Sequence, residues 1–218
     1  MSTLLEHLPA LLDDDPSVAA VLGRRTASLA VAEPARAMVL ASLVRRTGRS
    51  PLVVAVPTGT EAERLANDLR LFLGDLPSGR SAVELFPAWE TLPFERISPG
   101  VETMGRRLRA LHRLASIDDR PLVVVASGRA LVQRLGPGAG RIDPIRIGPG
   151  DTVDQQALIA DLVDVGYRRE YQVEHRGELA VRGSIIDVWP STDDAPVRID
   201  LWGDEVERLT EFGVADQR

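Results

Sequence analysis

The stretch whose pattern most resembles a ligand-binding site runs from Ser28 to Arg46 and reads SLAVAEPARAMVLASLVRR. An apolar run passes through a short loop directly into a helical pattern. A strand, a loop and a helix in this order can place backbone N–H groups under a phosphate. A working phosphate loop also needs glycines that wrap the anion, then a lysine and a hydroxyl residue at the helix start.

The residues of this loop do not suit a phosphate. The loop lacks glycine, Glu33 adds a negative charge, Pro34 has no N–H donor, and Ala37 has no hydroxyl group to hold magnesium. All 26 basic residues of the chain are arginine, which excludes a phosphate-binding lysine. We therefore predict that the degenerate phosphate loop, formed by Ala32, Glu33, Pro34, Ala35, Arg36 and Ala37, binds no nucleotide. No cofactor is expected in this chain.

Two groups of arginines are candidates for binding. Arg168, Arg169, Arg176 and Arg182 fall within a short segment of an otherwise acidic region, and Glu178 has the same strand parity as Arg182. Taken alone, this pattern favours a solvated sheet face, on which arginine–glutamate pairs contribute little. The second group is Arg106, Arg109 and Arg113, expected on a helix face opposite an apolar stripe. Such a face can follow a nucleic-acid backbone, although solvated arginines are the commoner case.

Composition excludes several other classes of protein. The chain has no cysteine, and its three histidines lie far apart, so no metal site is expected. The N-terminus resembles no targeting segment, and no apolar run is long enough to span a membrane, which favours a cytoplasmic protein without membrane contact. Residues 1–133 are nearly neutral, whereas residues 134–213 carry nine arginines against sixteen acidic residues. This acidic half argues against sequence-independent binding of nucleic acid there.

The elements that must position these residues follow from hydrophobic periodicity. In the first half, short β-branched runs are expected as strands at 26–32 and within PLVVAVP, AVELFP and PLVVVAS. They alternate with helical patterns at 34–46, 61–72 and 101–115, which is typical of a parallel sheet covered on both faces. The second half predicts a helix near 152–165, a hairpin turning near Gly177, a bulge at Gly183 and strands in VRIDLW and EVERLTEF.

The predicted fold class is therefore α/β, with a parallel-sheet domain followed by a small α+β domain with a mixed or antiparallel sheet. The glycine- and proline-rich stretch from Gly136 to Gly150 indicates a domain junction. The expected domains are residues 1–133 and 134–213, and residues 214–218 begin a following segment.

Two stretches carry a resemblance to a known family. They are LFPAWETLPFERISPGVETMGRRLRALHRL, and RGSIIDVWP followed by RIDLWGDEVE. The sequence resembles the N-terminal UvrB-homology region (domains 1A and 2) of the bacterial transcription-repair coupling factors (Mfd). The resemblance implies a degenerate helicase-like first domain, in which the 32–37 loop is the remnant of an ATP site. The short stretch from Trp89 to Val101 leaves no room for the aromatic hairpin with which UvrB clamps DNA.

The resemblance also implies a function. The second domain of this family binds UvrA, and Arg168 and Arg182 match the family arginines that face UvrA, with Arg169 and Glu178 beside them. The implied role is a non-catalytic adaptor that recruits UvrA to stalled RNA polymerase in transcription-coupled nucleotide excision repair. RNA polymerase and DNA would be bound beyond this fragment, where the full-length protein would be an ATP-dependent DNA translocase. The alternatives are a DNA-binding module or a nucleotide-binding helicase domain of an excision-repair protein.

Overall fold

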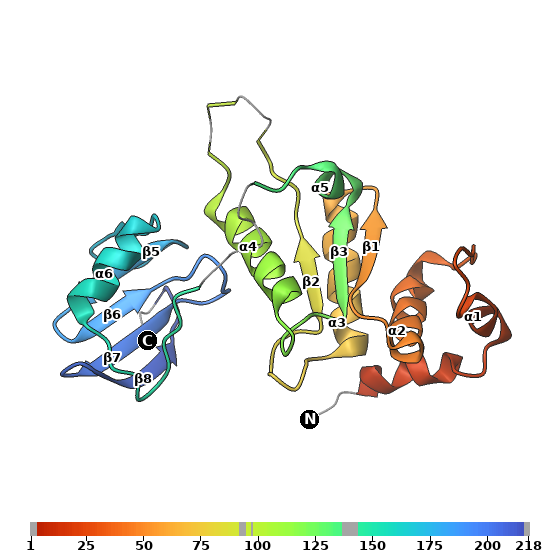
Figure 1. Cartoon of the computed structure of the whole chain (residues 1–218), viewed down its shortest axis with the longest axis horizontal. Coiled ribbons are helices and arrows are strands. Elements are labelled where there is room, and N and C mark those ends of the chain that lie inside the picture. The colour runs from red at the N-terminus through yellow and green to blue at the C-terminus, as the bar shows by residue number, and fades with distance from the viewer. Residues whose placement is uncertain (1–3, 92–94, 97, 137–143, 216–218) are drawn as a thin grey trace. The chain divides into compact units, whose positions relative to one another are not determined.

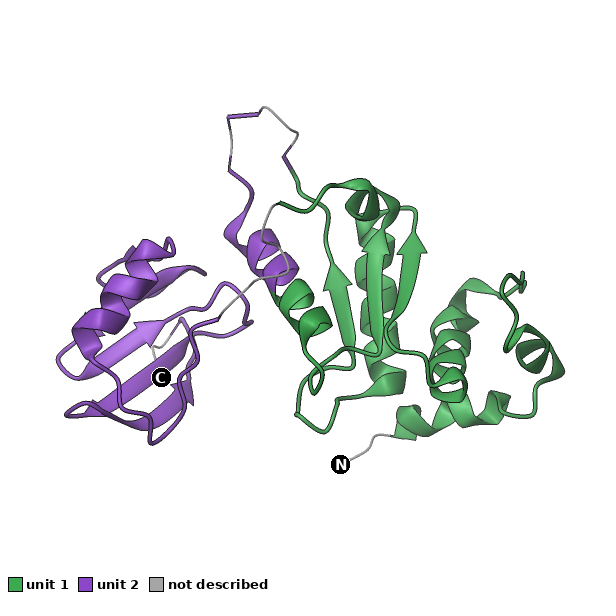
Figure 2. Ribbon diagram, viewed as in Figure 1, with its two compact units in different colours: residues 1–90, 109–141 green, residues 91–108, 142–218 purple. Residues whose placement is uncertain are grey.

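The computed structural model describes residues 4–91, 95–96, 98–136 and 144–215. The chain forms two compact units, one of residues 1–90 with 109–141 and the other of residues 91–108 with 142–218 (Figure 2). The first unit contains a parallel three-stranded sheet and the second a mixed five-stranded sheet. These sheets confirm the predicted fold class. The predicted division at 133/134 stays a prediction, and residues 137–143 of the junction and 216–218 of the last segment lie outside the described residues.

The three strands of the first unit run side by side in the order β1-β3-β2 (Figure 1). Helix α3 packs on one face of this sheet with α2 against it, and α4 and α5 pack on the other face. Strands β2 and β3 are buried along their whole length and are mostly apolar, as in other parallel sheets, whereas β1 alternates half-buried with exposed residues. The elements are η1 (Leu4–Leu12), α1 (Pro16–Val21), η2 (Glu33–Ala35), α2 (Arg36–Thr47), β1 (Leu52–Val56), α3 (Gly59–Leu73), β2 (Val83–Phe86), α4 (Val101–Ala115), β3 (Val123–Ser127) and α5 (Gly128–Val132).

The strand expected at residues 26–32 is absent. These residues form no regular secondary structure and are exposed or half-buried, although the three other predicted strands of this half are present as β1, β2 and β3. The prediction was wrong because the run offers only Leu29 and Val31 as sizeable apolar side chains. Pairing it with a sheet would bury little apolar surface against the entropy cost of ordering its backbone.

The second unit contains a sheet with the strand order β4-β5-β6-β7-β8. Helix α6 covers one face of this sheet, where Leu158 and Leu162 pack against Leu179, Ile186 and residues of β7 and β8. We call the opposite side the open face. Strand β5 places Glu178, Ala180 and Arg182 on it, and of these three Arg182 is exposed, whereas Ala180 packs beneath Val173 and Phe212. The elements are α6 (Gln155–Asp164), β4 (Arg168–Arg169), β5 (Glu178–Arg182), β6 (Ile185–Val188), β7 (Val197–Trp202) and β8 (Glu205–Glu211).

The hairpin of this unit turns at a different glycine from the one expected. Strands β5 and β6 are antiparallel and turn at Gly183, which has a φ of +61°, whereas Gly177 precedes β5. Strand β4 pairs with β5 in parallel, so residues 170–177 are a crossover connection and not a hairpin turn. The left-handed backbone that a tight turn requires explains the glycine at 183. The bulge predicted at this position is therefore wrong, and the irregularity lies between Asp200 and Leu201.

Gly105 allows the first half of α4 to lie very close to the loop that follows β6. A Cβ atom at this position would overlap with the backbone carbonyl group of Ser191. Both residues belong to the second unit. This approach gives a physical reason for a glycine in the middle of a helix, where glycine costs about 1 kcal/mol relative to alanine.

We therefore expect Gly105→Ala to destabilise the chain by about 1–3 kcal/mol, since overpacking against backbone outweighs the gain in helix propensity. Urea denaturation of the whole chain measures this change. The control is Gly128→Ala at the start of α5, because an added Cβ there meets nothing within 4 Å. A Gly105→Ala variant as stable as the wild type would contradict the proposed contact.

Candidate partner-binding surface

The register of β4 and β5 separates the two neighbouring arginines of β4. Arg168 lies opposite Glu178 and Arg169 lies opposite Leu179. Because side chains of paired residues point to the same side of a sheet, Arg168 belongs to the open face together with Arg182. Leu179 packs under α6, so Arg169 belongs to the α6 side of the sheet. Of the four predicted residues, Arg168, Glu178 and Arg182 are thus brought to one face and Arg169 is not.

Glu178 is almost completely buried, with 5% of its surface exposed. Its Oε2 accepts hydrogen bonds from the backbone N–H groups of Glu174 at 2.9 Å and His175 at 2.8 Å. Its Oε1 lies 3.5 Å from Nη2 of Arg168, whose side chain is 67% exposed. Burial of a carboxylate is costly unless hydrogen bonds and a cation compensate, and both are present here. Glu178 therefore holds the crossover connection and orients Arg168, while the exposed surface is provided by Arg168.

Arg182 ends β5 and is exposed. Its Nη2 donates a hydrogen bond to the carbonyl oxygen of Tyr171 at 3.4 Å, and its guanidinium carbon lies 5.7 Å from the centre of the Tyr171 ring. Arg176, also in the predicted cluster, is engaged differently. It pairs with Asp194 at 2.8 Å and lies over the ring of Trp189 at 5.5 Å. Of the predicted cluster, the arginines that are exposed on the open face at this edge are therefore Arg168 and Arg182.

A buried ion pair on the open face went unnoticed in the sequence. Asp187 of β6, 1% exposed, accepts two hydrogen bonds from Arg198 of β7, from Nε at 2.7 Å and from Nη2 at 2.9 Å. The pKa of Arg198 is raised, chiefly by its hydrogen bonds to Asp187, so the guanidinium stays charged. The sequence does contain an indication of this pair. Asp187 interrupts the apolar run Ile185–Val188, and Arg198 alternates with apolar residues in β7, so a charged residue in each strand would need a partner. The pair joins the two stretches that carried the family resemblance.

The arginines of α4 do not form the exposed stripe expected from the sequence. Arg113 is buried and pairs with Glu84 of β2 at 2.8 Å, and Arg109 lies 3.2 Å from the same carboxylate. Arg106 is partly exposed and pairs with Glu102 on its own helix at 2.6 Å. The helix instead leaves Val101, Met104 and Leu108 exposed. The expectation failed because Glu84 is buried within an apolar strand, and its charge draws the two arginines inward.

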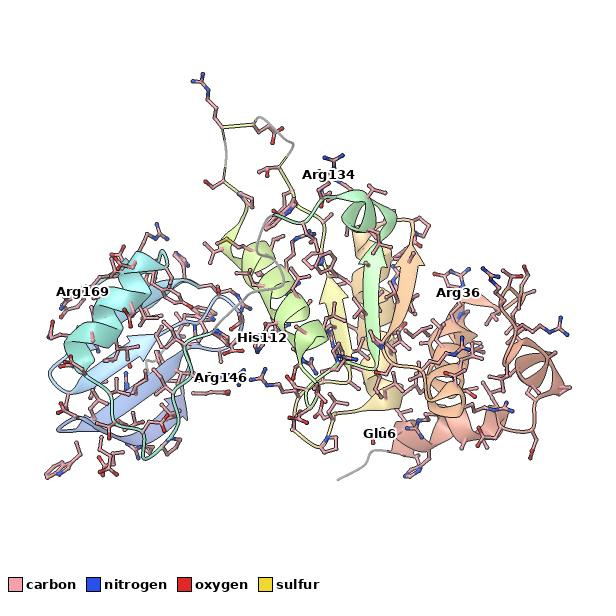
Figure 3. The ribbon with its side chains drawn as sticks, in the orientation of Figure 1. Glu6, Arg36, His112, Arg134, Arg146 and Arg169 are labelled. Carbon is pink, nitrogen blue, oxygen red and sulfur yellow. The ribbon has the colours of Figure 1, made fainter. Side chains whose placement is uncertain are left out.

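The degenerate phosphate loop is largely exposed, and one of its six residues, Ala37, is buried. Residues 33–35 form η2 and Arg36 begins α2 (Figure 3). Ala37, at the position where a phosphate loop would carry its hydroxyl, is buried in the core beside α3. The carboxylate of Glu33 lies 3.7 Å from Nη1 of Arg64, and both side chains are 67% exposed. This arrangement places a carboxylate, and no hydroxyl, at the start of the helix.

Comparison with known proteins shows a family to which most of the second unit is similar. Residues 145–218 match the family model of the UvrB interaction domain. This range contains the whole five-stranded sheet, α6 and the open face described above. This part of the second unit is therefore similar to UvrB interaction domains.

The chain as a whole belongs to the bacterial transcription-repair-coupling factors. It is 46% identical over 202 residues to the transcription-repair-coupling factor of Mycobacterium tuberculosis, a match that covers 90% of this chain and 16% of the relative. It is 35% identical over 198 residues to that of Myxococcus xanthus and 30% identical over 169 residues to that of Escherichia coli, covering 90% and 77% of this chain. The resemblance noted in the sequence is confirmed. The chain spans about one sixth of the length of the first two relatives.

Among the residues that the structure describes, none of the helices has the length and apolar character needed to cross a membrane.

Proposed function

We propose that this chain is the part of a transcription-repair coupling factor that recruits UvrA, and that it does so without catalysis. UvrA binds the open face of the second unit at the β4–β5 edge, and the chain delivers it to RNA polymerase stalled at a lesion in transcription-coupled nucleotide excision repair. Other parts of a longer protein bind RNA polymerase and DNA and act as the ATP-dependent translocase. The supporting observation is that Arg168 and Arg182 share one face within the residues that match the UvrB interaction domain.

The electrostatic environment supports this assignment. Residues 134–213 carry an excess of acidic residues, yet the open face presents two exposed arginines at the β4–β5 edge. Guanidinium groups offer planar sets of donors that recognise carboxylates and carbonyls in a fixed geometry, and arginine is enriched at binding hot spots. A partner surface with carboxylates would therefore match this edge.

Two rival functions fit the sequence and the structure less well. A nucleotide-binding helicase domain is disfavoured by Glu33, Pro34 and Ala37 in the loop and by the absence of lysine from the chain. A DNA-binding module is disfavoured by the net charge of −6 and by the ion pairs that engage Arg106, Arg109 and Arg113. We propose that the chain needs no cofactor.

Three binding measurements on the whole chain separate these functions. Titration with UvrA is expected to show saturable binding. Magnesium and ATP at millimolar concentration are expected to leave the melting temperature unchanged, because a ligand that binds only the folded state would raise it. An electrophoretic shift with duplex DNA is expected to show at most weak, salt-sensitive binding, without preference for a lesion. An ATP-dependent rise that magnesium alone does not produce, or tight binding to damaged DNA, would overturn the assignment.

A further inference from the structure

Tyr171 is the most exposed large side chain beside the two arginines of the open face. It follows β4 by two residues, and 88% of its surface is accessible to solvent. Arg182 contacts it twice, through the hydrogen bond to its carbonyl oxygen at 3.4 Å and through the guanidinium group over its ring at 5.7 Å. The side chain is therefore both exposed and held in place by a residue of the proposed interface.

The backbone on either side of Tyr171 is fixed to the sheet. The N–H group of Glu170 donates to the carbonyl oxygen of Leu179 at 2.8 Å. On the other side Val173 is fully buried and packs against Ala180 and Phe212. The next two N–H groups, of Glu174 and His175, are bound by the carboxylate of Glu178. Because the connection is anchored before and after Tyr171, a partner that binds the ring has little backbone entropy to remove.

A tyrosine presented in this way has the properties of an interface anchor. It supplies a large, rigid and amphipathic contact area with few rotatable bonds, and tyrosine and arginine are the residue types enriched at hot spots. The guanidinium of Arg182 stabilises one side of the ring by a cation–π interaction, which also places the positive charge next to the apolar surface. A partner that fits would offer an apolar hollow bordered by carboxylates.

We propose that Tyr171 is the apolar anchor of the UvrA-binding face and that Arg182 positions it. The anchor inserts into an apolar hollow on UvrA, while Arg168 and Arg182 pair with carboxylates at the border of that hollow. This inference rests on the proposed function. It adds a residue, Tyr171, whose ring raises the affinity for UvrA by fitting the shape of the hollow. Arg182 then has two roles, since it binds UvrA directly and holds the aromatic ring.

The test is a titration of UvrA against the whole chain and its variants, with a melting curve for each. Tyr171→Ala is expected to weaken binding by about tenfold or more, because it removes the ring that becomes buried in the complex with UvrA. Tyr171→Phe retains the ring and is expected to stay within about threefold of the wild type. The matched control is Ile117→Ala in the first unit, which removes an apolar side chain that is 87% exposed and is expected to leave affinity unchanged.

A double variant tests the positioning role of Arg182. If Arg182 holds the ring, Tyr171→Ala should cost less affinity in an Arg182→Ala background than in the wild type, because residues in contact do not act additively. Additive losses would overturn the positioning role. Wild-type affinity of Tyr171→Ala, combined with a loss in Arg182→Ala, would overturn the anchor and leave the proposed function intact. Failure of the wild-type chain to bind UvrA would instead overturn the proposed function, and the anchor with it.

Discussion

Asp187→Ala is expected to destabilise the second unit by about 3 kcal/mol, and UvrA binding should weaken only to the extent that the unit unfolds. The substitution removes the carboxylate that accepts both hydrogen bonds of Arg198 and leaves the guanidinium on the sheet without this partner. Breaking a buried ion pair from one side costs about 3–5 kcal/mol. The lower end applies here because the side chain of Arg198 is partly exposed. Urea denaturation followed by tryptophan fluorescence measures the change, since Trp189 and Trp202 lie in this unit.

The control for this variant is a second aspartate–arginine pair in the same sheet. Asp200 pairs with Arg208 at 3.0 Å, but the side chain of Arg208 is 71% exposed. An exposed pair contributes about 0–1 kcal/mol, so Asp200→Ala should cost far less than Asp187→Ala. Equal stability losses in the two variants would show that burial of the Asp187–Arg198 pair is not what stabilises the sheet.

Arg182→Ala is expected to weaken UvrA binding by about 2–4 kcal/mol, or roughly 30-fold to 1000-fold, without unfolding the chain. Truncation leaves carboxylates of the partner unpaired in the complex and removes the group that holds Tyr171. Arg168→Ala is also expected to weaken UvrA binding, because it removes the proposed direct contact between Arg168 and UvrA. Both side chains are exposed, and Glu178 keeps its two backbone hydrogen bonds when Arg168 is removed, so the melting temperatures of both variants should stay within a few degrees of the wild type. UvrA titration and thermal melting on the same samples measure both quantities.

The matched control for Arg168→Ala is Arg64→Ala in the first unit. Both side chains are 67% exposed, and each lies near one carboxylate, at 3.5 Å for Arg168 and 3.7 Å for Arg64. Arg64→Ala and Arg106→Ala should leave UvrA affinity unchanged. Wild-type affinity in both Arg168→Ala and Arg182→Ala, with folding intact, would exclude the proposed surface. A loss through Arg106→Ala would move the partner surface to α4.

Local sequence pattern was sufficient for most of the secondary structure. The β-branched runs at β1, β2 and β3 and the helical period of α4 were predicted at or near their observed bounds, as was the alternation of Ile199 and Leu201 with polar residues in β7. These predictions succeeded because burial on one or both faces imposes a period that the sequence must carry. The RGSIIDVWP and RIDLWGDEVE stretches also identified the family. In the structure they contain the paired strands β6 and β7 of one sheet.

Contacts between segments far apart in the sequence decided two features that the local sequence pattern could not predict. Whether residues 26–32 become a strand depends on a partner strand and on the area buried, which the sequence of the segment does not contain. Helical periodicity placed Arg109 and Arg113 on a polar face, but the charge that buries them belongs to Glu84 on β2.

In the candidate site, too, some features follow from the sequence and others only from the tertiary structure. The sequence alone determined that arginines gather between residues 168 and 182 and that no lysine-dependent phosphate chemistry is possible. Only the tertiary structure decided that Arg168 lies on the open face with Arg182 while Arg169 lies on the α6 side, because this follows from the parallel register of β4 and β5. The same crossover buries Glu178 and exposes Tyr171. Side-chain direction in a strand is set by its hydrogen-bonded neighbour, and that neighbour is fixed only when the whole sheet has formed.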